Sequence, residues 1–339
     1  MSRKHTIVLF SRVLVVVLFC AALAACGGDS SSDSSGAGAG NEDGPKVAAL
    51  FTQSVSQGNW DPAGYKAFKA MADKYGFSSS YVEQATYEKA PAILRDLAAK
   101  GTKLIICHSS GYAAAVEEVA PDFPDTQFVI FSYASDTKGL ANYSAWSMDW
   151  DQYGYMIGVI AASSSKTGHI AVVGGEPIPS TKRTIEFITK GAKQVNPNIE
   201  VTSTYIGSWT DAAKGKEISL QALNSGADFL IPVADTAGAG VQQAAEENGA
   251  LTLGEYIDQS PDYPKSIVTS TVVDMDGAYD EIGKGFSDGT LKGQIVQMNI
   301  GEGDLTFVEP FEHVDPAVQE KVDGILEQIK SGELDVAAS

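Results

Sequence analysis

The residue with the most chemical content is a tryptophan beside a short polar loop. Trp60 follows Thr52-Gln53-Ser54-Val55-Ser56-Gln57-Gly58-Asn59, and this loop follows the apolar run 47–51. An indole set among short polar side chains can stack on a flat ligand. Asn59 and Asp61, on either side of the indole, can hydrogen-bond the edge of such a ligand. The alternative is that Trp60 packs into the core, and the loop alone leaves both interpretations open.

Three further candidates come just after apolar runs that have the length of strands: Ser109, Ser110 and Asp235. A fourth candidate, Trp209, follows the predicted strand 199–205 after a short polar turn. Open α/β sheets bind ligands outside the carboxyl ends of their strands, so we expect these side chains to meet Trp60 at one site. For Trp209 the alternative is an apolar contact that caps the next helix.

Other patterns do not support covalent or metal chemistry. Ser163 and Lys166 have the spacing of a serine–lysine pair but lie at the polar end of a predicted helix, and Gly238-Ala239-Gly240 lacks the third glycine of a dinucleotide loop. Cys107 lies in an apolar run, where a buried structural thiol is expected. The histidines lie too far apart for metal-ligand spacing: His5, His108, His169 and His313. We therefore expect no catalytic residues, no metal site and no cofactor.

Alternating strands and helices must position these candidates. Such runs alternate through 46–133 and again through 140–250, which predicts two α/β lobes with parallel sheets. Lobe 1 is expected at about 46–133 plus about 253–285, and lobe 2 at about 134–252 plus the C-terminal segment. The residues after 250 should pass back and forth between the lobes, so the hinge would have several strands.

The helix after the Trp60 loop has recognisable ends. Asp61-Pro62 is typical of an N-cap acid followed by proline at the first helical position, and Gly76 is typical of the residue that ends a helix. The apolar face between them consists of Tyr65, Phe68, Ala72 and Tyr75.

The N-terminus has the features of an export signal. The apolar run 13–22 is short for a membrane span, and three basic residues come before it: Arg3, Lys4 and Arg12. Leu23-Ala24-Ala25-Cys26 resembles the lipobox of bacterial lipoproteins. This resemblance implies a signal peptide at 1–25 and lipidation of Cys26, and the alternative is an ordinary cleavage site. We expect a lipid-anchored protein on the outer or periplasmic face of the cell membrane.

Composition adds two expectations. The segment 26–45 is rich in Gly, Ser and Asp, which is typical of a flexible linker. The whole chain has 43 acidic and 24 basic residues and a formal net charge of −19. Such a charge argues against binding to nucleic acid or to an anionic lipid surface.

Longer stretches carry a family resemblance. The most telling are Tyr155-Met156-Ile157-Gly158-Val159-Ile160-Ala161-Ala162, Lys166-Thr167-Gly168-His169-Ile170-Ala171-Val172-Val173-Gly174-Gly175 and Gly238-Ala239-Gly240-Val241-Gln242-Gln243-Ala244-Ala245-Glu246-Glu247-Asn248-Gly249. Their order and spacing resemble the basic membrane protein family of lipoproteins, which are purine-nucleoside-receptor-like substrate-binding proteins of ABC transporters. The resemblance implies a type I periplasmic-binding fold, in which two doubly wound parallel-sheet lobes joined by a multi-strand hinge close on a ligand.

The resemblance also implies roles for individual residues. Trp60 stands where the family has an aromatic residue that stacks on a purine, and Asp61 stands where a polar residue bonds the base. Trp209 is similar to the family's second aromatic residue, so two indoles from opposite lobes would sandwich one ring. Hydrogen bonds from Ser109, Ser110 and Asp235 would add to this stacking.

One stretch departs from the family pattern. Nucleoside-binding members resemble Gly-Val-Asp before Asp-Gln, whereas this chain has Gly254-Glu255-Tyr256-Ile257-Asp258-Gln259. Tyr256 therefore stands where an acid would bind ribose, and the lysine expected after Thr269-Ser270 is absent. A free purine such as adenine becomes at least as plausible as a nucleoside, unless Glu255 replaces the missing acid.

Together these patterns predict a monomeric solute-binding lipoprotein that delivers a small planar heterocycle to an ABC permease. One alternative is a lipoprotein that senses its ligand for a membrane receptor. The other is an extracellular nucleoside hydrolase, for which the chain offers no candidate acid–base pair.

Overall fold

The computed structural model describes residues 35–37 and 44–338. The predicted signal peptide, Cys26 and most of the predicted linker lie outside the described residues. Within that linker, Ser35–Ala37 forms a short strand, β1, which pairs antiparallel with β3 (Ser78–Val82). These three residues therefore differ from the flexible linker that we expected. Pairing with β1 covers the otherwise open edge of β3.

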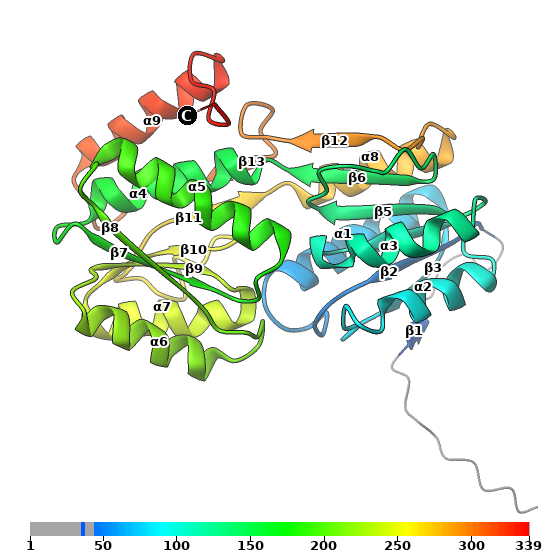
Figure 1. Cartoon of the computed structure of the whole chain (residues 1–339), viewed down its shortest axis with the longest axis horizontal. Helices are drawn as coiled ribbons and strands as arrows, with labels where there is room; N and C mark the ends of the chain where they lie inside the picture. Colours follow the sequence, from blue (N-terminus) through cyan, green and yellow to red (C-terminus); the bar gives the residue numbers. More distant parts are fainter. Residues whose placement is uncertain (1–34, 38–43, 339) are drawn as a thin grey trace, which may run out of the picture. The chain divides into compact units, whose positions relative to one another are not determined.

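Lobe 1 is built on a seven-stranded sheet with the order β1-β3-β2-β4-β5-β6-β12 (Figure 1). Its remaining strands are β2 (Lys46–Leu50), β4 (Leu104–Cys107), β5 (Gln127–Ser132), β6 (Tyr143–Met148) and β12 (Ile295–Met298). Successive side chains of a strand point to opposite faces. Val47 and Ala49 accordingly pack towards α1 (Trp60–Tyr75) and α8 (Met275–Ser287), whereas Ala48 and Leu50 pack towards α2 (Ala90–Ala99) and α3 (Ala113–Val119).

Lobe 2 is built on a six-stranded sheet with the order β13-β11-β10-β9-β7-β8. The strands are β7 (His169–Gly174), β8 (Glu200–Tyr205), β9 (Phe229–Val233), β10 (Leu251–Gly254), β11 (Ile267–Val273) and β13 (Leu305–Phe307). Helices α4 (Trp150–Ser164) and α5 (Pro179–Val195) cover one face, and α6 (Ala212–Asn224) and α7 (Gly238–Asn248) cover the other. The last helix, α9 (Pro316–Lys330), packs on α4.

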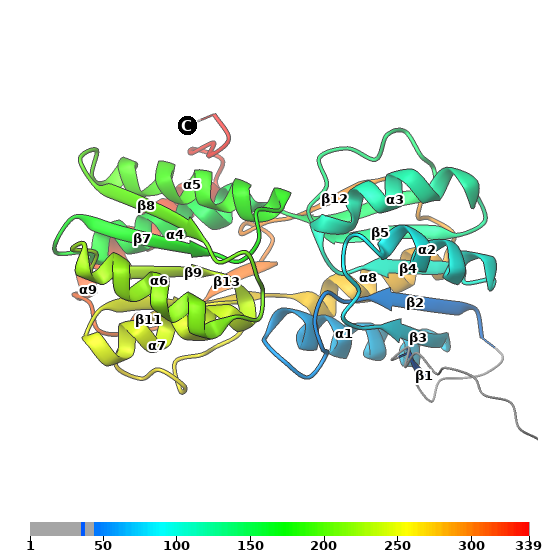
Figure 2. The same ribbon diagram turned by 60° about the horizontal axis from the view of Figure 1, so that its bottom comes forward.

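The chain passes between the two sheets three times, and the sheets lie side by side (Figures 1 and 2). The passages lie between β6 and α4, between β11 and α8, and between β12 and β13. All neighbouring strands pair in parallel except β1 with β3 and β11 with β13. This arrangement confirms the predicted pair of doubly wound lobes and the hinge of several segments.

The predicted lobe boundaries are wrong in two places. Residues 134–148, which we placed in lobe 2, include β6 and belong to the sheet of lobe 1. Residues 253–273, which we placed in lobe 1, include β11 and belong to the sheet of lobe 2. Among the described residues, none of the helices combines the length and the hydropathy that a membrane span requires.

Candidate ligand-binding site

A small cavity lies where the carboxyl ends of strands from both lobes meet. Its volume is about 40 Å³, enough for roughly three water molecules. The lining residues from lobe 1 are Thr52, Gln53, Trp60, Tyr87, Ser109 and Ser132, and those from the lobe 2 side are Trp150, Ile178, Ser180, Thr181, Thr184, Trp209, Val233, Asp235 and Tyr256. This is the position at which open α/β sheets bind ligands.

Five of the residues predicted for the site line this cavity. They are Trp60, Ser109, Trp209, Asp235 and Tyr256. The other four predicted residues lie next to the cavity but do not line it: Asn59, Asp61, Ser110 and Glu255. The hydroxyl of Ser110 contacts that of Ser180 at 3.0 Å and so joins the lobes. Sequence reasoning missed Tyr87, which lies five residues after β3, and Trp150, which follows β6, a strand that the sequence analysis did not predict.

The indole of Trp60 is held by reciprocal bonds with His108. Its Nε1–H donates to the carbonyl oxygen of His108 at 3.0 Å, and the two rings stack with their centroids 4.8 Å apart. The His108 Nε2 lies 3.1 Å from the Trp60 carbonyl oxygen, which can only accept, so Nε2 carries the proton. The Nδ1 then accepts from the Tyr279 hydroxyl at 2.7 Å. Burial lowers the pKa of His108 to about 3, which keeps the ring neutral.

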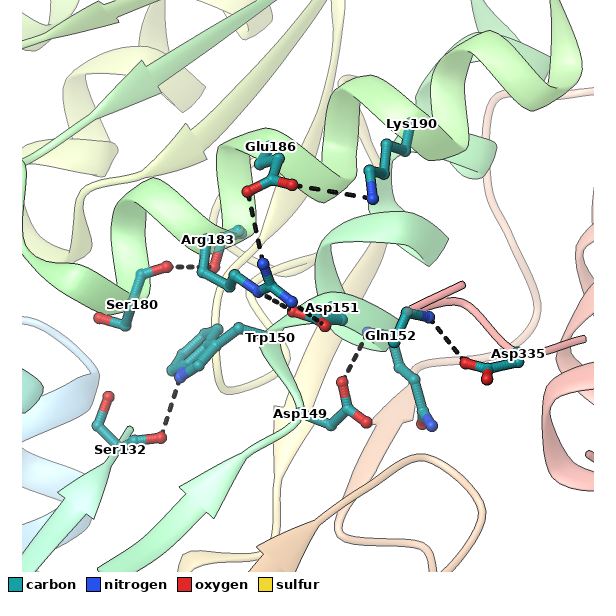
Figure 3. A network of polar contacts seen from close by, with 12 residues as sticks. Ser132, Asp149, Trp150, Asp151, Gln152, Ser180, Arg183, Glu186, Lys190 and Asp335 are labelled. Atoms are coloured by element: carbon teal, nitrogen blue, oxygen red, sulfur yellow. Dashed lines mark hydrogen bonds and ion pairs between the residues drawn. The ribbon is translucent and has the colours of Figure 1, made fainter. Parts of the chain in front are cut away.

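Two more indoles form the cavity wall from the lobe 2 side. The Nε1–H of Trp150 donates to the carbonyl oxygen of Ser132 at 2.9 Å (Figure 3). Trp209 packs over Gly175, where a Cβ atom would lie 2.4 Å from the indole. The buried Nε1 of Trp209 has no hydrogen-bond partner within the described ranges. Three of the four tryptophans of the chain thus line one cavity.

An ion-pair network fixes the two helices that carry Trp150 and other lining residues of the lobe 2 side (Figure 3). The guanidinium of Arg183 on α5 donates twice to the Asp151 carboxylate on α4, at 2.5 and 2.6 Å. Glu186 lies 3.6 Å from Arg183 and 3.8 Å from Lys190. The bidentate pair joins the first turns of α4 and α5, the helices that carry Trp150, Ser180 and Thr184.

Asp235 of lobe 2 binds the start of helix α1 in lobe 1. Its Oδ1 accepts from the backbone N–H groups of Asn59 at 2.8 Å and Trp60 at 3.2 Å, and its Oδ2 accepts from Gln53 Nε2 at 2.5 Å. A carboxylate at this position satisfies free N–H groups of the first turn and interacts favourably with the helix dipole. We define these three bonds as the Asp235 latch.

The latch requires a close approach of the two lobes at Gly58. This residue has φ +77°, and a Cβ atom on it would lie 2.3 Å from Thr236 Oγ1 and 2.8 Å from the Asp235 carboxylate. Only glycine fits such a contact in this backbone conformation without strain.

The expected role of Asp61 as a helix cap is wrong. Helix α1 begins at Trp60 with Asn59 as the N-cap residue, and the Asn59 side chain makes no capping bond. The fully buried Asp61 instead accepts from Gln53 N at 2.7 Å and Thr52 Oγ1 at 3.0 Å. It therefore holds the loop that carries two cavity-lining residues.

Glu255 and Tyr256 point to different places. The Glu255 carboxylate turns away from the cavity and accepts from the Ala234 backbone N–H at 3.1 Å. Tyr256 adopts φ +68°, an uncommon value for a non-glycine residue, and its ring lies edge-on to Trp60 with centroids 4.8 Å apart. Asn59 contacts the same turn, since its Nδ2 donates to the Glu255 carbonyl oxygen at 3.4 Å.

The acids around the cavity hold their protons strongly. Burial, together with the nearby charge of Asp235, raises the pKa of Asp61 to about 7 and that of Glu255 to about 8. Burial also raises the pKa of Asp235, against the lowering effect of its hydrogen bonds to Asn59, Trp60 and Gln53. The three acids therefore resist ionisation together, because burial favours the protonated form of each, and the charge of Asp235 adds to this effect on Asp61 and Glu255.

Comparison with known proteins agrees with this two-lobed geometry. A family described as Bmp, the PnrA-like ABC transporter substrate-binding proteins, matches residues 45–339. The chain belongs to the Bmp family. This match confirms the predicted family, whose members are described as substrate-binding proteins of ABC transporters.

Two relatives of this Bmp protein have names that describe different functions. The transcriptional activator protein Med of Bacillus subtilis (strain 168) is 30% identical over 294 residues, which cover 85% of this chain and 90% of the relative. A purine-binding protein of Brucella abortus (strain 2308) is 29% identical over 295 residues, covering 85% and 82%. Among solved structures, a solute-binding protein of an ABC transporter system from Aeropyrum pernix K1 superposes with a TM-score of 0.76 at 18% identity, covering 86% of this chain and 92% of that chain.

Proposed function

We propose that this Bmp protein captures a purine in the cavity between its lobes and delivers it to an ABC permease. The observation that carries the proposal is the wall of indoles contributed from both sides, Trp60 from lobe 1 and Trp150 and Trp209 from the lobe 2 side. Flat indole faces bind flat rings, and stacking on an aromatic side chain is worth about 1–3 kcal/mol per base. The similarity to a protein named purine-binding supports the same ligand class.

Capture requires the lobes to move. A fused bicyclic ring is larger than the cavity of about 40 Å³, so the lobes must separate for entry, and the cavity walls must lie further apart when they hold the ring. Three hinge passages and the Asp235 latch suit such a clamp. Micromolar affinity needs about 8 kcal/mol, so hydrogen bonds and burial of the ring must add to the stacking by Trp60 and Trp209.

Within this class we propose a free base such as adenine rather than a nucleoside. Tyr256 occupies the wall where the family resemblance implies a ribose-binding acid, and the Glu255 carboxylate is bonded to Ala234 instead of lining the cavity. A ribose would therefore meet an aromatic edge in place of a carboxylate.

Calorimetry with adenine, hypoxanthine, adenosine and inosine tests both statements. We expect adenine to bind at least as tightly as adenosine. Binding of adenosine about a hundredfold tighter than adenine, a difference of roughly 2.7 kcal/mol, would show that Tyr256 has been misinterpreted. Absence of binding by all four compounds would exclude a purine ligand.

We also propose that lipid on Cys26 anchors the mature protein to the outer or periplasmic face of the membrane. The proposal rests on the lipobox-like Leu23-Ala24-Ala25-Cys26, and acyl chains add roughly 0.8 kcal/mol per buried methylene. Cys26→Ser should release the protein from the membrane fraction. Equal membrane retention of both forms would contradict lipidation.

A second candidate function is ligand sensing. It is favoured by the similarity to a protein named as a transcriptional activator, and the same clamp can present a ligand to a receptor. Deletion of the gene should abolish uptake of labelled adenine if the protein serves a permease. Unchanged uptake with altered transcription would favour the sensor.

A further inference from the structure

The cavity combines aromatic walls with buried acids and no basic residue. Its lining includes Trp60, Tyr87, Trp150, Trp209 and Tyr256, and none of the described residues that line it is a lysine, arginine or histidine. Such walls attract cations, because the face of an aromatic ring is electron-rich. The same walls exclude water and so strengthen the field of nearby charges.

Three carboxylates lie in or directly behind this wall. Asp61, Asp235 and Glu255 are 0%, 7% and 3% exposed. The charged neighbours that act on Asp61 and Glu255 include Asp235, which is itself an acid. Within the described ranges, the hydrogen-bond donors to the three carboxylates are backbone N–H groups and the side chains of Gln53 and Thr52. A buried carboxylate without a counter-ion is costly, so these acids tend to hold their protons. A cation in the cavity would favour their ionised forms and would then interact favourably with them.

Gln53 provides an independent observation that points to the ligand. Its Nε2 donates to Asp235, so its Oε1 is fixed as the acceptor. Gln53 is 5% exposed and lines the cavity, and this Oε1 has no hydrogen-bond partner among the described residues. A ligand that fills the cavity must therefore offer an N–H or O–H group at this place.

We propose that the cavity selects planar rings that carry a positive charge and N–H donors, such as an amidinium-type edge, and rejects anionic rings. The charge interacts with the three carboxylates and the indole faces, and an N–H group donates to Gln53 Oε1. This inference rests on the same cavity as the proposed function and refines its ligand class. Among planar heterocycles it favours protonated or N-alkylated amino-heterocycles over neutral bases such as adenine, and it excludes phosphorylated nucleosides.

Three nearly isosteric probes test the charge preference on the wild-type protein: benzamidine (cationic), benzamide (neutral) and benzoate (anionic). Intrinsic fluorescence reports binding, since three of the four tryptophans line the cavity. We expect benzamidine to bind about tenfold or more tighter than benzamide, with no detectable binding of benzoate. Equal affinities for benzamidine and benzamide, or no benzamidine binding while adenine binds, would overturn the proposal.

A variant pair assigns the preference to the buried acids. Glu255→Gln keeps an oxygen for the Ala234 N–H and, at a pH above the Glu255 pKa of about 8, removes one charge. At such a pH it should lower the benzamidine-to-benzamide affinity ratio about fivefold or more. Glu320→Gln, the same change at an exposed position of α9, should leave the ratio unchanged. Equal ratios in wild type and both variants would contradict the role of the carboxylates.

The two proposals fail separately. A benzamidine preference without binding of any purine would refute the purine function and support the charge selection. Binding of adenine together with a preference for benzamide over benzamidine would support the purine function and refute the charge selection.

Discussion

Removal of the Asp235 latch should weaken ligand binding by opening the clamp. Asp235→Ala deletes the acceptor of three bonds between the lobes, from Asn59 N at 2.8 Å, Trp60 N at 3.2 Å and Gln53 Nε2 at 2.5 Å. Loss of a carboxylate at a helix N-terminus costs about 1 kcal/mol, and leaving the buried Gln53 amide unpaired costs about 1–3 kcal/mol. The closed state should therefore lose about 2–4 kcal/mol relative to the open state.

Such a loss lowers the population of the closed state, and the apparent affinity falls with it. A change of about 2 kcal/mol corresponds to a roughly 30-fold higher Kd. Calorimetry with adenine measures the Kd, and small-angle scattering of the ligand-free protein measures the separation of the lobes. Asp262→Ala, the same change at an exposed position of lobe 2, is the matched control. Wild-type affinity and unchanged scattering in Asp235→Ala would refute the latch.

Three further predictions follow from the site. Trp60→Ala and Trp209→Ala should each weaken adenine binding about tenfold or more with native circular dichroism, and unchanged affinity in both would exclude stacking. Gly58→Ala should weaken binding, because the added Cβ would lie 2.3 Å from Thr236 Oγ1 when the lobes are closed. The control Gly249→Ala has a similar φ of +68° but no atom near the added Cβ, so it should leave binding unchanged. Equal effects of both variants would exclude a steric role of Gly58 in closure. Asp61→Asn should flatten the pH dependence of the free energy of unfolding. Its pKa is about 7 when folded and 3.8 in the reference state, so the folded protein binds the proton more strongly and the wild type loses stability as pH rises from about 4 to 7, by on the order of 4 kcal/mol. Urea unfolding at pH 4 and pH 8 measures this difference, and parallel profiles for both proteins would contradict it.

The elements of the fold were largely predictable, because apolar runs and helical repeats are local. Strand β6 was missed because Ser144 and Ser147 interrupt its apolar pattern, although both are buried. The lobe assignment of β10 and β11 was not predictable in the same way. Which sheet a strand joins depends on pairing with partners far along the chain, as β11 does with β13, and no local pattern encodes that choice.

The site was predictable where a residue closely follows a predicted strand, as with Ser109, Asp235 and, after a short turn, Trp209. It was not predictable where backbone conformation decides the direction of a side chain. The φ of +68° at Tyr256 separates its ring from the Glu255 carboxylate, and sequence alone gives no sign of it. Trp150 was missed because it opens a helix on the far side of a hinge passage, so its approach to Trp60 depends on how the lobes close.

A crystal structure of the protein grown with adenine would show where the ring binds. We expect the ring between the lobes, in stacking contact with Trp60 or Trp209 and with an N–H group donating to Gln53 Oε1. A ring bound elsewhere, or both indoles covered by side chains of their own lobe in the complex, would contradict this expectation.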